Sequence, residues 1–274
     1  MKNKIFLQNH IISIFILLAF AWTFVLLGIV ILISGVGLDP ASLPPWQLII
    51  VFLGGFGPSI VGILVTRMTG NKGTLWKRIK MYKLSGWLYI FALGVIILIA
   101  IISMILDSLL GIPVNSTAEM LSILPLALIW PVFSSTGEEL GWRGVLLPEL
   151  QKKYSPFISA LVVGILWGLW HFPSYLIALG TLGVNFIPYF ILSGPISFIG
   201  LSVVMTLVYN KAKGSLFILI LMHYTITMTG MLFVRLDLTF EQTLVHSSLS
   251  FILYVILGAL FIIFNKKEWI FVKS

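Results

Sequence analysis

Long apolar segments, each about as long as a bilayer is thick, recur from one end of this chain to the other. A helix needs about 20 consecutive apolar residues to cross the hydrocarbon core. Hydrophobic residues make up 59% of the sequence and charged residues only 9%, against about 25% charged in soluble domains. The sequence therefore predicts an all-α, polytopic helical bundle in the lipid bilayer, with residues 1–274 forming one transmembrane domain. The eight predicted spans are 11–34, 46–66, 87–110, 122–133 with its continuation into a polar stretch, 157–177, 186–209, 215–234 and 244–264.

The basic residues predict how this bundle is oriented. All but one of the 17 Lys and Arg fall before the first span, after the last span or in alternate connections, and Arg235 is the exception. Eight spans place these basic segments on one side, and the positive-inside rule makes that side cytoplasmic. We therefore expect both termini, Lys72 and Lys211 to be cytoplasmic in a multi-pass protein of the plasma membrane. The net charge of +8 then reflects cytoplasmic loops, and no nucleic-acid partner is expected.

A pair of glutamates lies where an apolar span meets a polar stretch. On a helix Glu139 and Arg143 are four residues apart and share a face, so the spacing predicts an ion pair. Glu138 points about 100° away and lacks that partner, which leaves its carboxylate available for chemistry. The alternative interpretation is a charge cluster solvated at the end of a helix.

Two histidines lie inside predicted spans. Pro173 is expected to kink or end the helix beside His171, because proline has no backbone N–H. His223 follows an apolar run without a polar neighbour. Either histidine alone is as consistent with a hydrogen-bonded structural role as with a functional one, but intramembrane ionisable groups need polar partners. We therefore expect Glu138, His171 and His223 to form one site that faces a cavity open to the cytoplasm.

Two other features are interpreted as structural. The glycine-rich run 54–58 predicts close helix packing through small residues rather than a substrate path. His246, at the outer end of the last span, is expected to lie far from the other intramembrane histidines.

Three motifs in the second half of the chain resemble those of the CPBP family, which comprises CAAX proteases and bacteriocin-processing (Abi) proteins. The resemblance runs from residue 138 to about residue 227, within a motif core of about 120–234. The residues of the motifs are similar to those of the bacterial branch. It implies an intramembrane protease fold and a hydrolase activity. The residues that carry it are Glu138, Glu139 and Arg143, then Trp167 before His171, then His223.

The resemblance also implies a role for each of these residues. In that family the groups at the positions of Glu138 and His171 activate a water, and the group at His223 stabilises the oxyanion. Glu139 and Arg143 would take supporting roles. One supporting position departs from the pattern: Thr227 stands where the family often has asparagine, and its hydroxyl donates a hydrogen bond over a shorter reach.

Whether a cofactor takes part is left open by the sequence. One glutamate and two histidines form the ligand set of several catalytic zinc sites, so Glu138, His171 and His223 are candidate zinc ligands. The family has also been described as metal-free glutamic proteases, and the chain lacks the His-Glu-x-x-His helix of many zinc peptidases. The absence of cysteine excludes disulfides and thiolate ligands.

Three functions compete at this point. The first is an intramembrane endopeptidase that cleaves peptides or membrane-anchored proteins from the cytoplasmic side, and it uses both a base for water and an oxyanion stabiliser. The second is a non-proteolytic immunity or scaffold protein on the same fold, motivated by Thr227. The third is a small transporter with Glu138 and His171 as a proton relay, although the broken-helix pairs typical of inverted-repeat transporters are not evident.

Overall fold

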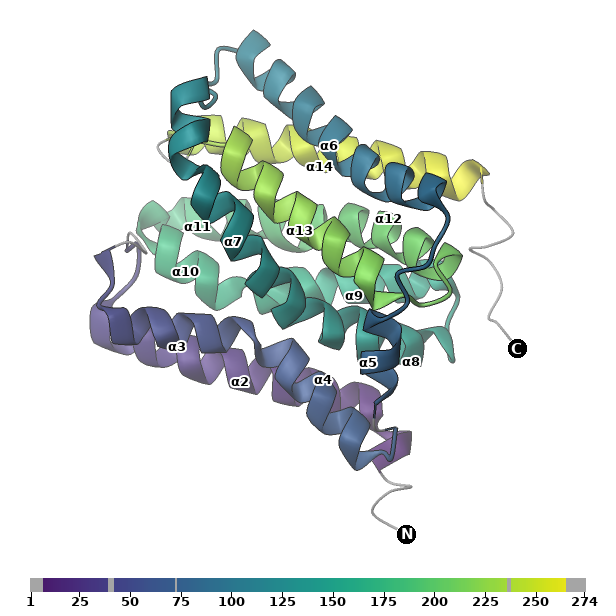
Figure 1. Ribbon diagram of the computed structural model, residues 1–274. Helices are drawn as coiled ribbons and strands as arrows, with labels where there is room; N and C mark the ends of the chain where they lie inside the picture. The colour runs from purple at the N-terminus through teal and green to yellow at the C-terminus, as the bar shows by residue number, and fades with distance from the viewer. Residues whose placement is uncertain (1–6, 39–41, 72, 236–237, 265–274) are drawn as a thin grey trace.

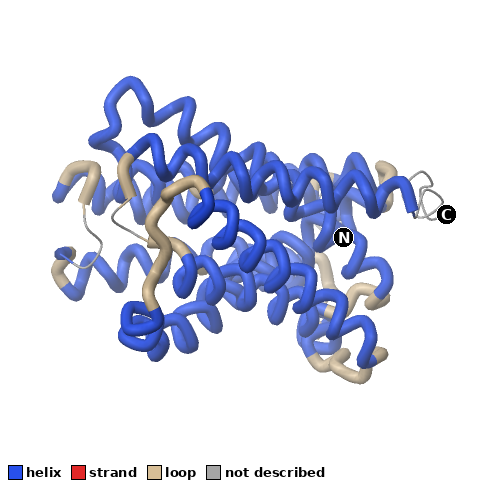
Figure 2. The backbone as a smooth tube through the Cα atoms, turned by 90° about the horizontal axis from the view of Figure 1, so that it is seen from above, coloured by secondary structure: helices blue, strands red, loops and turns tan. Residues whose placement is uncertain are grey.

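The computed structural model describes residues 7–38, 42–71, 73–235 and 238–264. Within these ranges every regular element is a helix, and the only β-type pairing is an isolated bridge between Val114 and Val234 (Figure 2). Seven helices are long and apolar enough to cross a membrane, or eight if one bent pair is counted as a span. The predicted all-α, multi-pass bundle is confirmed, and each of the eight predicted runs is helical.

The helices follow one another with few long connections (Figure 1). In chain order they are α2 (Ile11–Ser34), α3 (Pro45–Gly55), α4 (Gly57–Met68), α5 (Thr74–Ile79), α6 (Gly86–Leu109), α7 (Thr117–Gly141), the π-helical turn η2 (Trp142–Leu146), α8 (Leu147–Gln151), α9 (Pro156–Trp170), α10 (Phe172–Leu179), the 3₁₀ segment η3 (Gly180–Asn185), α11 (Phe186–Ile191), the π-helical turn η4 (Leu192–Ile196), α12 (Ser197–Lys211), α13 (Leu216–Phe233) and α14 (Phe240–Phe264).

The fourth span is longer than the sequence predicts. It begins at Thr117 because Ser116 and Glu119 form a capping box, in which each side chain bonds to the other residue's backbone N–H. It then continues through η2 and α8 to Gln151, so that the glutamate pair lies inside a continuous helix rather than at its end. The interpretation of a solvated charge cluster at a helix end is therefore wrong.

Two spans are broken, and proline lies at both breaks. The α3–α4 pair bends by 47° at Phe56, and Pro58 occupies the first turn of α4. Helix α9 ends at Trp170 and α10 begins at Phe172, so the chain breaks at His171, as Pro173 predicts. Proline has no backbone N–H to continue the hydrogen-bond ladder, which is why each break falls beside it.

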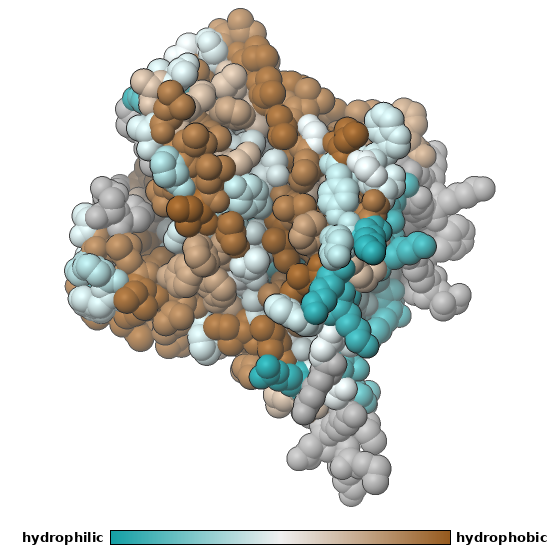
Figure 3. Space-filling view, viewed as in Figure 1, coloured by the Kyte–Doolittle hydropathy of each residue, from teal (hydrophilic) through white to brown (hydrophobic). Residues whose placement is uncertain are grey.

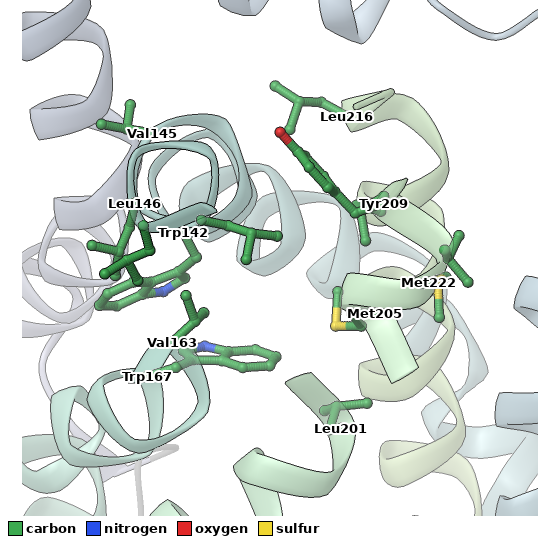
Figure 4. Close-up of a cluster of buried hydrophobic side chains, with 14 of the residues drawn as sticks. Trp142, Val145, Leu146, Val163, Trp167, Leu201, Met205, Tyr209, Leu216 and Met222 are labelled. Carbon is green, nitrogen blue, oxygen red and sulfur yellow. The ribbon is translucent and has the colours of Figure 1, made fainter. Parts of the chain in front are cut away.

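Helices α7 and α13 pack against one another at the centre of the bundle, with α4 against α7 and α6 against α13 (Figure 1). Behind them α12 packs on α9 and α14, and α2 covers α3 and α4. The core surrounds η2: Trp142 and Trp167 are almost fully buried and lie close together, with Met205 across the cluster (Figure 4).

The glycines of the run 54–58 have two kinds of surroundings. A Cβ added to Gly54 would lie 2.1 Å from Leu27 Cδ1, and one added to Gly57 would lie 2.5 Å from Thr23 Oγ1. Both glycines therefore allow α2 to pack closely, as the sequence predicts. A Cβ on Gly55 meets nothing within 4 Å, so this glycine faces open space.

Hydrophilic residues gather at one end of the molecule, over α5 and its neighbouring loops, beside broad hydrophobic flanks (Figure 3). Arg143 does not belong to this group, since it is fully buried inside the fourth span, and its interpretation as a loop charge is wrong. Several of the basic residues used in the sequence analysis lie outside the described residues: Lys2, Lys4, Lys72, Lys266, Lys267 and Lys273.

The orientation of the bundle is tested by paired cysteine substitutions in this cysteine-free chain. Lys153 lies at the basic end of the bundle. Leu110 directly follows α6 at the opposite end of the bundle, and both side chains are exposed. Because basic loops stay in the cytoplasm, Lys153→Cys is expected to resist an impermeant thiol reagent in intact cells and Leu110→Cys to react. The reverse labelling pattern would invert the orientation.

Candidate active site

The two adjacent glutamates of α7 have different partners. Arg143 Nη1 donates to Glu139 Oε1 at 2.9 Å, and both side chains are fully buried. The Arg143 guanidinium also lies 4.1 Å from the centre of the Trp167 ring. The ion pair predicted from the spacing is therefore present, and the carboxylate of Glu139 is neutralised by Arg143.

The π-helical turn η2 carries Arg143, and a second arginine supports it from outside. A π turn widens the helix by one residue and disturbs the usual carbonyl partners. Arg78 of α5 donates to the carbonyls of Arg143 and Gly144, both at 2.8 Å, and to that of Gly214 at 2.7 Å. Burial lowers the pKa of the Arg78 guanidinium, although Tyr209 opposes this shift. An arginine pKa starts far above neutral pH, so the group stays charged.

His171 lies at the break between α9 and α10, where its ring is held in one orientation. Its Nδ1 is 2.8 Å from the carbonyl oxygen of Trp167, while its backbone N–H bonds to Gly168 O instead. A carbonyl can only accept, so Nδ1 carries the proton and, in the neutral ring, Nε2 presents its lone pair. The His171 ring packs edge-on against Trp170, with centroids 4.8 Å apart.

His223 of α13 lies between the two glutamates. Its Nδ1 is 2.9 Å from Glu139 Oε1, and its Nε2 is 4.0 Å from Glu138 Oε1. A carboxylate fixes Nδ1 as the donor, in the way that an acidic residue orients a catalytic histidine. Glu139 thus bridges Arg143 and His223, a double role that the i, i+4 spacing alone does not reveal.

Glu138 has one bonded oxygen and one that faces the cavity. The indole Nε1 of Trp167 donates to Glu138 Oε2. This leaves Oε1 directed toward His223, with room for a bridging water between groups 4.0 Å apart. The sequence identified Trp167 only as an aromatic motif residue, and its role as a donor to Glu138 was missed.

One cavity of about 330 Å³ joins the predicted residues. Glu138, His171, His223 and Thr227 all line it, and Thr227 follows His223 by one turn of α13, as expected for residues on one helical face. The rest of the wall is mainly apolar and comes partly from α3, a helix outside the motif core. These other lining residues are Val51, Phe52, Gly55, Phe56, Trp130, Phe133, Ser134, Trp167, Trp170, Ser174, Phe198, Leu201 and Ile226.

The zinc hypothesis is tested by the positions of the candidate ligands. Across the described ranges, no three His, Asp or Glu side chains lie close enough together to hold a metal ion. Glu138 Oε1 and His223 Nε2 are separated by 4.0 Å. The Nδ1 bonds of both histidines to protein oxygens leave Nε2 as the ring atom that a metal would use. As they stand, Glu138, His171 and His223 are too widely spaced to make three bonds of about 2.0–2.2 Å to one zinc ion.

His246 lies away from this cavity, as expected. Its Nδ1 is 2.6 Å from Oδ2 of Asp107, and the two residues connect the outer parts of α6 and α14. This pair borders a separate, smaller cavity and contributes nothing to the Glu138 site.

Comparison with known proteins points to one family. Residues 120–229 match the family described as type II CAAX prenyl endopeptidase Rce1-like. A curated relative, a CAAX prenyl protease 2 of Methanococcus maripaludis, is 28% identical over 146 residues, which cover 50% of this chain and 48% of the relative. The chain thus spans about half the length of the curated relative that it matches. The matched segment contains Glu138, His171, His223 and Thr227, but not the α3 wall of the cavity.

Proposed function

We propose that this chain, whose residues 120–229 match the Rce1-like family of type II CAAX prenyl endopeptidases, hydrolyses peptide bonds in membrane-associated proteins or peptides. The observation that carries this proposal is the meeting of Glu138, His171 and His223 on one cavity wall inside a multi-pass bundle. Three separate membrane-spanning segments, Thr117–Gln151, Pro156–Leu179 and Leu216–Phe233, each bring one of these groups there. Such groups are expensive inside a membrane and mark functional sites.

Water activation is assigned to Glu138 and His171. The Trp167 bond to Oε2 leaves Oε1 as the other oxygen of the Glu138 carboxylate. Because Nδ1 of His171 carries the proton, Nε2 of the neutral ring has an unshared lone pair. A water that donates hydrogen bonds to both of these acceptors can lose a proton to either of them while its oxygen attacks a peptide carbonyl. The proton then passes to the leaving amine, so that the site returns to its starting state.

Oxyanion stabilisation is assigned to His223 and Thr227. His223 Nδ1 donates to Glu139, so Nε2 becomes a second donor only when the ring is protonated. The carboxylate of Glu139 holds the ring in the orientation that this role needs. The Thr227 hydroxyl, on the same wall, supplies a neutral donor. Donors aimed at the developing charge are worth about 10²–10³ in rate.

The substrate class follows from the shape and chemistry of the cavity. Beside its polar groups, the cavity is lined by an aromatic cluster of Phe52, Trp130 and Phe133. An apolar wall of this kind suits a substrate that is itself anchored in the membrane. The name of the curated relative points to prenylated CAAX peptides, and the apolar wall is compatible with a lipid-modified peptide.

The proposal is tested with the purified chain in lipid vesicles and a library of membrane-anchored peptides. Cleavage at defined bonds is expected, with metal content measured on the same sample. A chain that cleaves nothing but drives a proton flux would be a transporter. If the protein's function in cells is unchanged in the Glu138→Gln variant, the protein acts as a non-proteolytic scaffold.

Gly55 is expected to control access to the cavity. Gly55 lines the cavity, and a Cβ added to it meets nothing within 4 Å, so the side chain of Gly55→Leu is expected to occupy part of the 330 Å³. We expect kcat/KM to fall roughly 10-fold or more, since a 1 Å misplacement of substrate can cost about 10²-fold, while the melting temperature is unchanged. Gly28→Leu is the matched control, because Gly28 also has open space around it but does not line the cavity. Equal activity of the two variants would exclude a substrate in contact with Gly55.

A further inference from the structure

The smaller cavity beside His246 has a volume of about 150 Å³ and lies between α6, α13 and α14. Helix α6 packs against both α13 and α14 on this flank of the bundle (Figure 1). Within the described part of the chain no lysine or arginine lines the cavity, and apart from the His246 ring its polar side chains offer only oxygen atoms. These polar residues are Ser103, Asp107, Thr229, His246, Ser250 and Tyr254.

Asp107 is buried with only one of its two carboxylate oxygens bonded. The residue is 4% exposed, and its Oδ2 lies 2.6 Å from His246 Nδ1. Its Oδ1 has no hydrogen-bond partner among the described residues. Buried polar atoms are almost always bonded, so an orphaned carboxylate oxygen indicates a further ligand such as a water or an ion. The terminal torsion of aspartate is soft, so a small turn of the carboxylate brings Oδ1 to the cavity.

A pair of serines lies next to this carboxylate, at a spacing that suits a cation better than a hydrogen bond. Ser103 is one turn from Asp107 on α6, and Ser250 is one turn from His246 on α14, so the four residues form two rungs between these helices. The two serine hydroxyl oxygens are 3.4 Å apart, whereas O–H···O bonds measure about 2.7–2.8 Å. Two oxygens that bind one cation at about 2.4 Å and at right angles lie about 3.4 Å apart.

The charge of Asp107 distinguishes a cation from a water or a proton. A water at Oδ1 supplies a hydrogen bond but leaves a buried negative charge beside a neutral His246. A proton on His246 neutralises the pair but brings nothing to Oδ1, because the bond from Nδ1 goes to Oδ2. Arg235, which follows the end of α13, is paired with Glu119. A cation at Oδ1 supplies both the contact and the charge, as is typical of buried carboxylates that coordinate metals.

We propose that this cavity binds one monovalent alkali-metal cation, Na⁺, through Asp107 and the hydroxyls of Ser103 and Ser250. Hard cations prefer oxygen ligands, and a single carboxylate balances one positive charge but not two. The Thr229 hydroxyl donates to Thr225 O at 2.8 Å, so its oxygen keeps lone pairs for a bound water or the ion. Bound Na⁺ would hold α6 and α14 together and would therefore raise the melting temperature. This site is independent of peptide hydrolysis.

The test uses the purified full-length chain in detergent, with choline chloride replaced stepwise by NaCl at constant ionic strength. Binding of ²²Na⁺ and the melting temperature are both measured. Asp107→Asn keeps an oxygen for His246 but loses the charge, which predicts roughly 10- to 100-fold weaker Na⁺ binding. Ser103→Ala removes one neutral ligand and predicts binding weaker by about 3- to 10-fold. Glu241→Gln is the matched control, because it removes an exposed carboxylate of α14 that does not line the cavity.

Saturable Na⁺ binding that is weakened in Asp107→Asn and Ser103→Ala but kept in Glu241→Gln would support the proposal. If Asp107→Asn does not fold, the difference between Ser103→Ala and Glu241→Gln decides the question. An equal response of the wild type and all variants would reduce the effect to bulk salt and overturn the proposal. The absence of ²²Na⁺ binding to the wild type would also overturn it and leave Asp107 and His246 as a structural pair. Tighter binding of Ca²⁺ than of Na⁺ would overturn the assignment of a monovalent ion.

Discussion

Glu138→Gln is expected to reduce the single-turnover rate of peptide cleavage by about 10²–10⁴-fold, the range for loss of a general base. The amide keeps an oxygen that can accept the Trp167 indole N–H, so the local packing is retained. It cannot take a proton from water, because its free atom is no longer a carboxylate oxygen. The melting temperature in detergent should therefore stay within a few degrees of wild type.

The matched control for this prediction is Glu149→Gln. Glu149 is another carboxylate of the same continuous helix, but it pairs with Lys152 outside the cavity. Its replacement should leave the cleavage rate unchanged. A Glu138→Gln variant that keeps more than roughly a tenth of the wild-type rate would show that Glu138 is not the base, given the size of general-base effects.

The spans were predictable from sequence because lipid imposes a length on every crossing helix. The break at His171 was predictable for an equally local reason, since Pro173 removes a backbone donor. The ion pair between Glu139 and Arg143 also follows from helix geometry within one turn. Each of these features depends on residues close together in the chain.

The partners of the site residues were not predictable in the same way. Which glutamate meets His223 depends on how α7 and α13 rotate against one another, and a single sequence does not fix that rotation. Trp167 looked like an aromatic packing residue until α9 brought its N–H to Glu138. The widened turn η2 has no sequence signature of its own, because its residues also suit an ordinary helix.

Arg78 shows how one general rule can hide a specific role. It lies among the basic residues of a connection between spans, where the positive-inside rule already explains a cation. Its three bonds to the carbonyls of Arg143, Gly144 and Gly214 come from segments more than 60 residues away in the sequence. The partial burial of Arg78 distinguishes it from the neighbouring basic residues, although the sequence places all of them in a loop.

Glu139→Gln is expected to destabilise the protein far more than Glu138→Gln does. Arg143 would remain fully buried without its bonded partner, and only the Trp167 ring and the carboxylate of Glu138 would offset its charge. Removing one partner of a buried ion pair costs about 3–5 kcal/mol. Cleavage should fall as well, because Glu139 also orients His223. Thermal unfolding in detergent, rather than activity, therefore distinguishes the two glutamates.

The double variant Glu139→Gln/Arg143→Met separates the two effects of Glu139. Methionine removes the buried charge and fits beside Met205, which already contacts the Arg143 guanidinium at 3.3 Å. Replacing a whole buried pair by apolar or neutral groups is often close to neutral for stability. The double variant should thus melt near wild type and well above Glu139→Gln. It should still cleave poorly, because His223 has lost the carboxylate that orients its ring. If the double variant unfolds as readily as the single one, the stranded charge of Arg143 is not what destabilises Glu139→Gln.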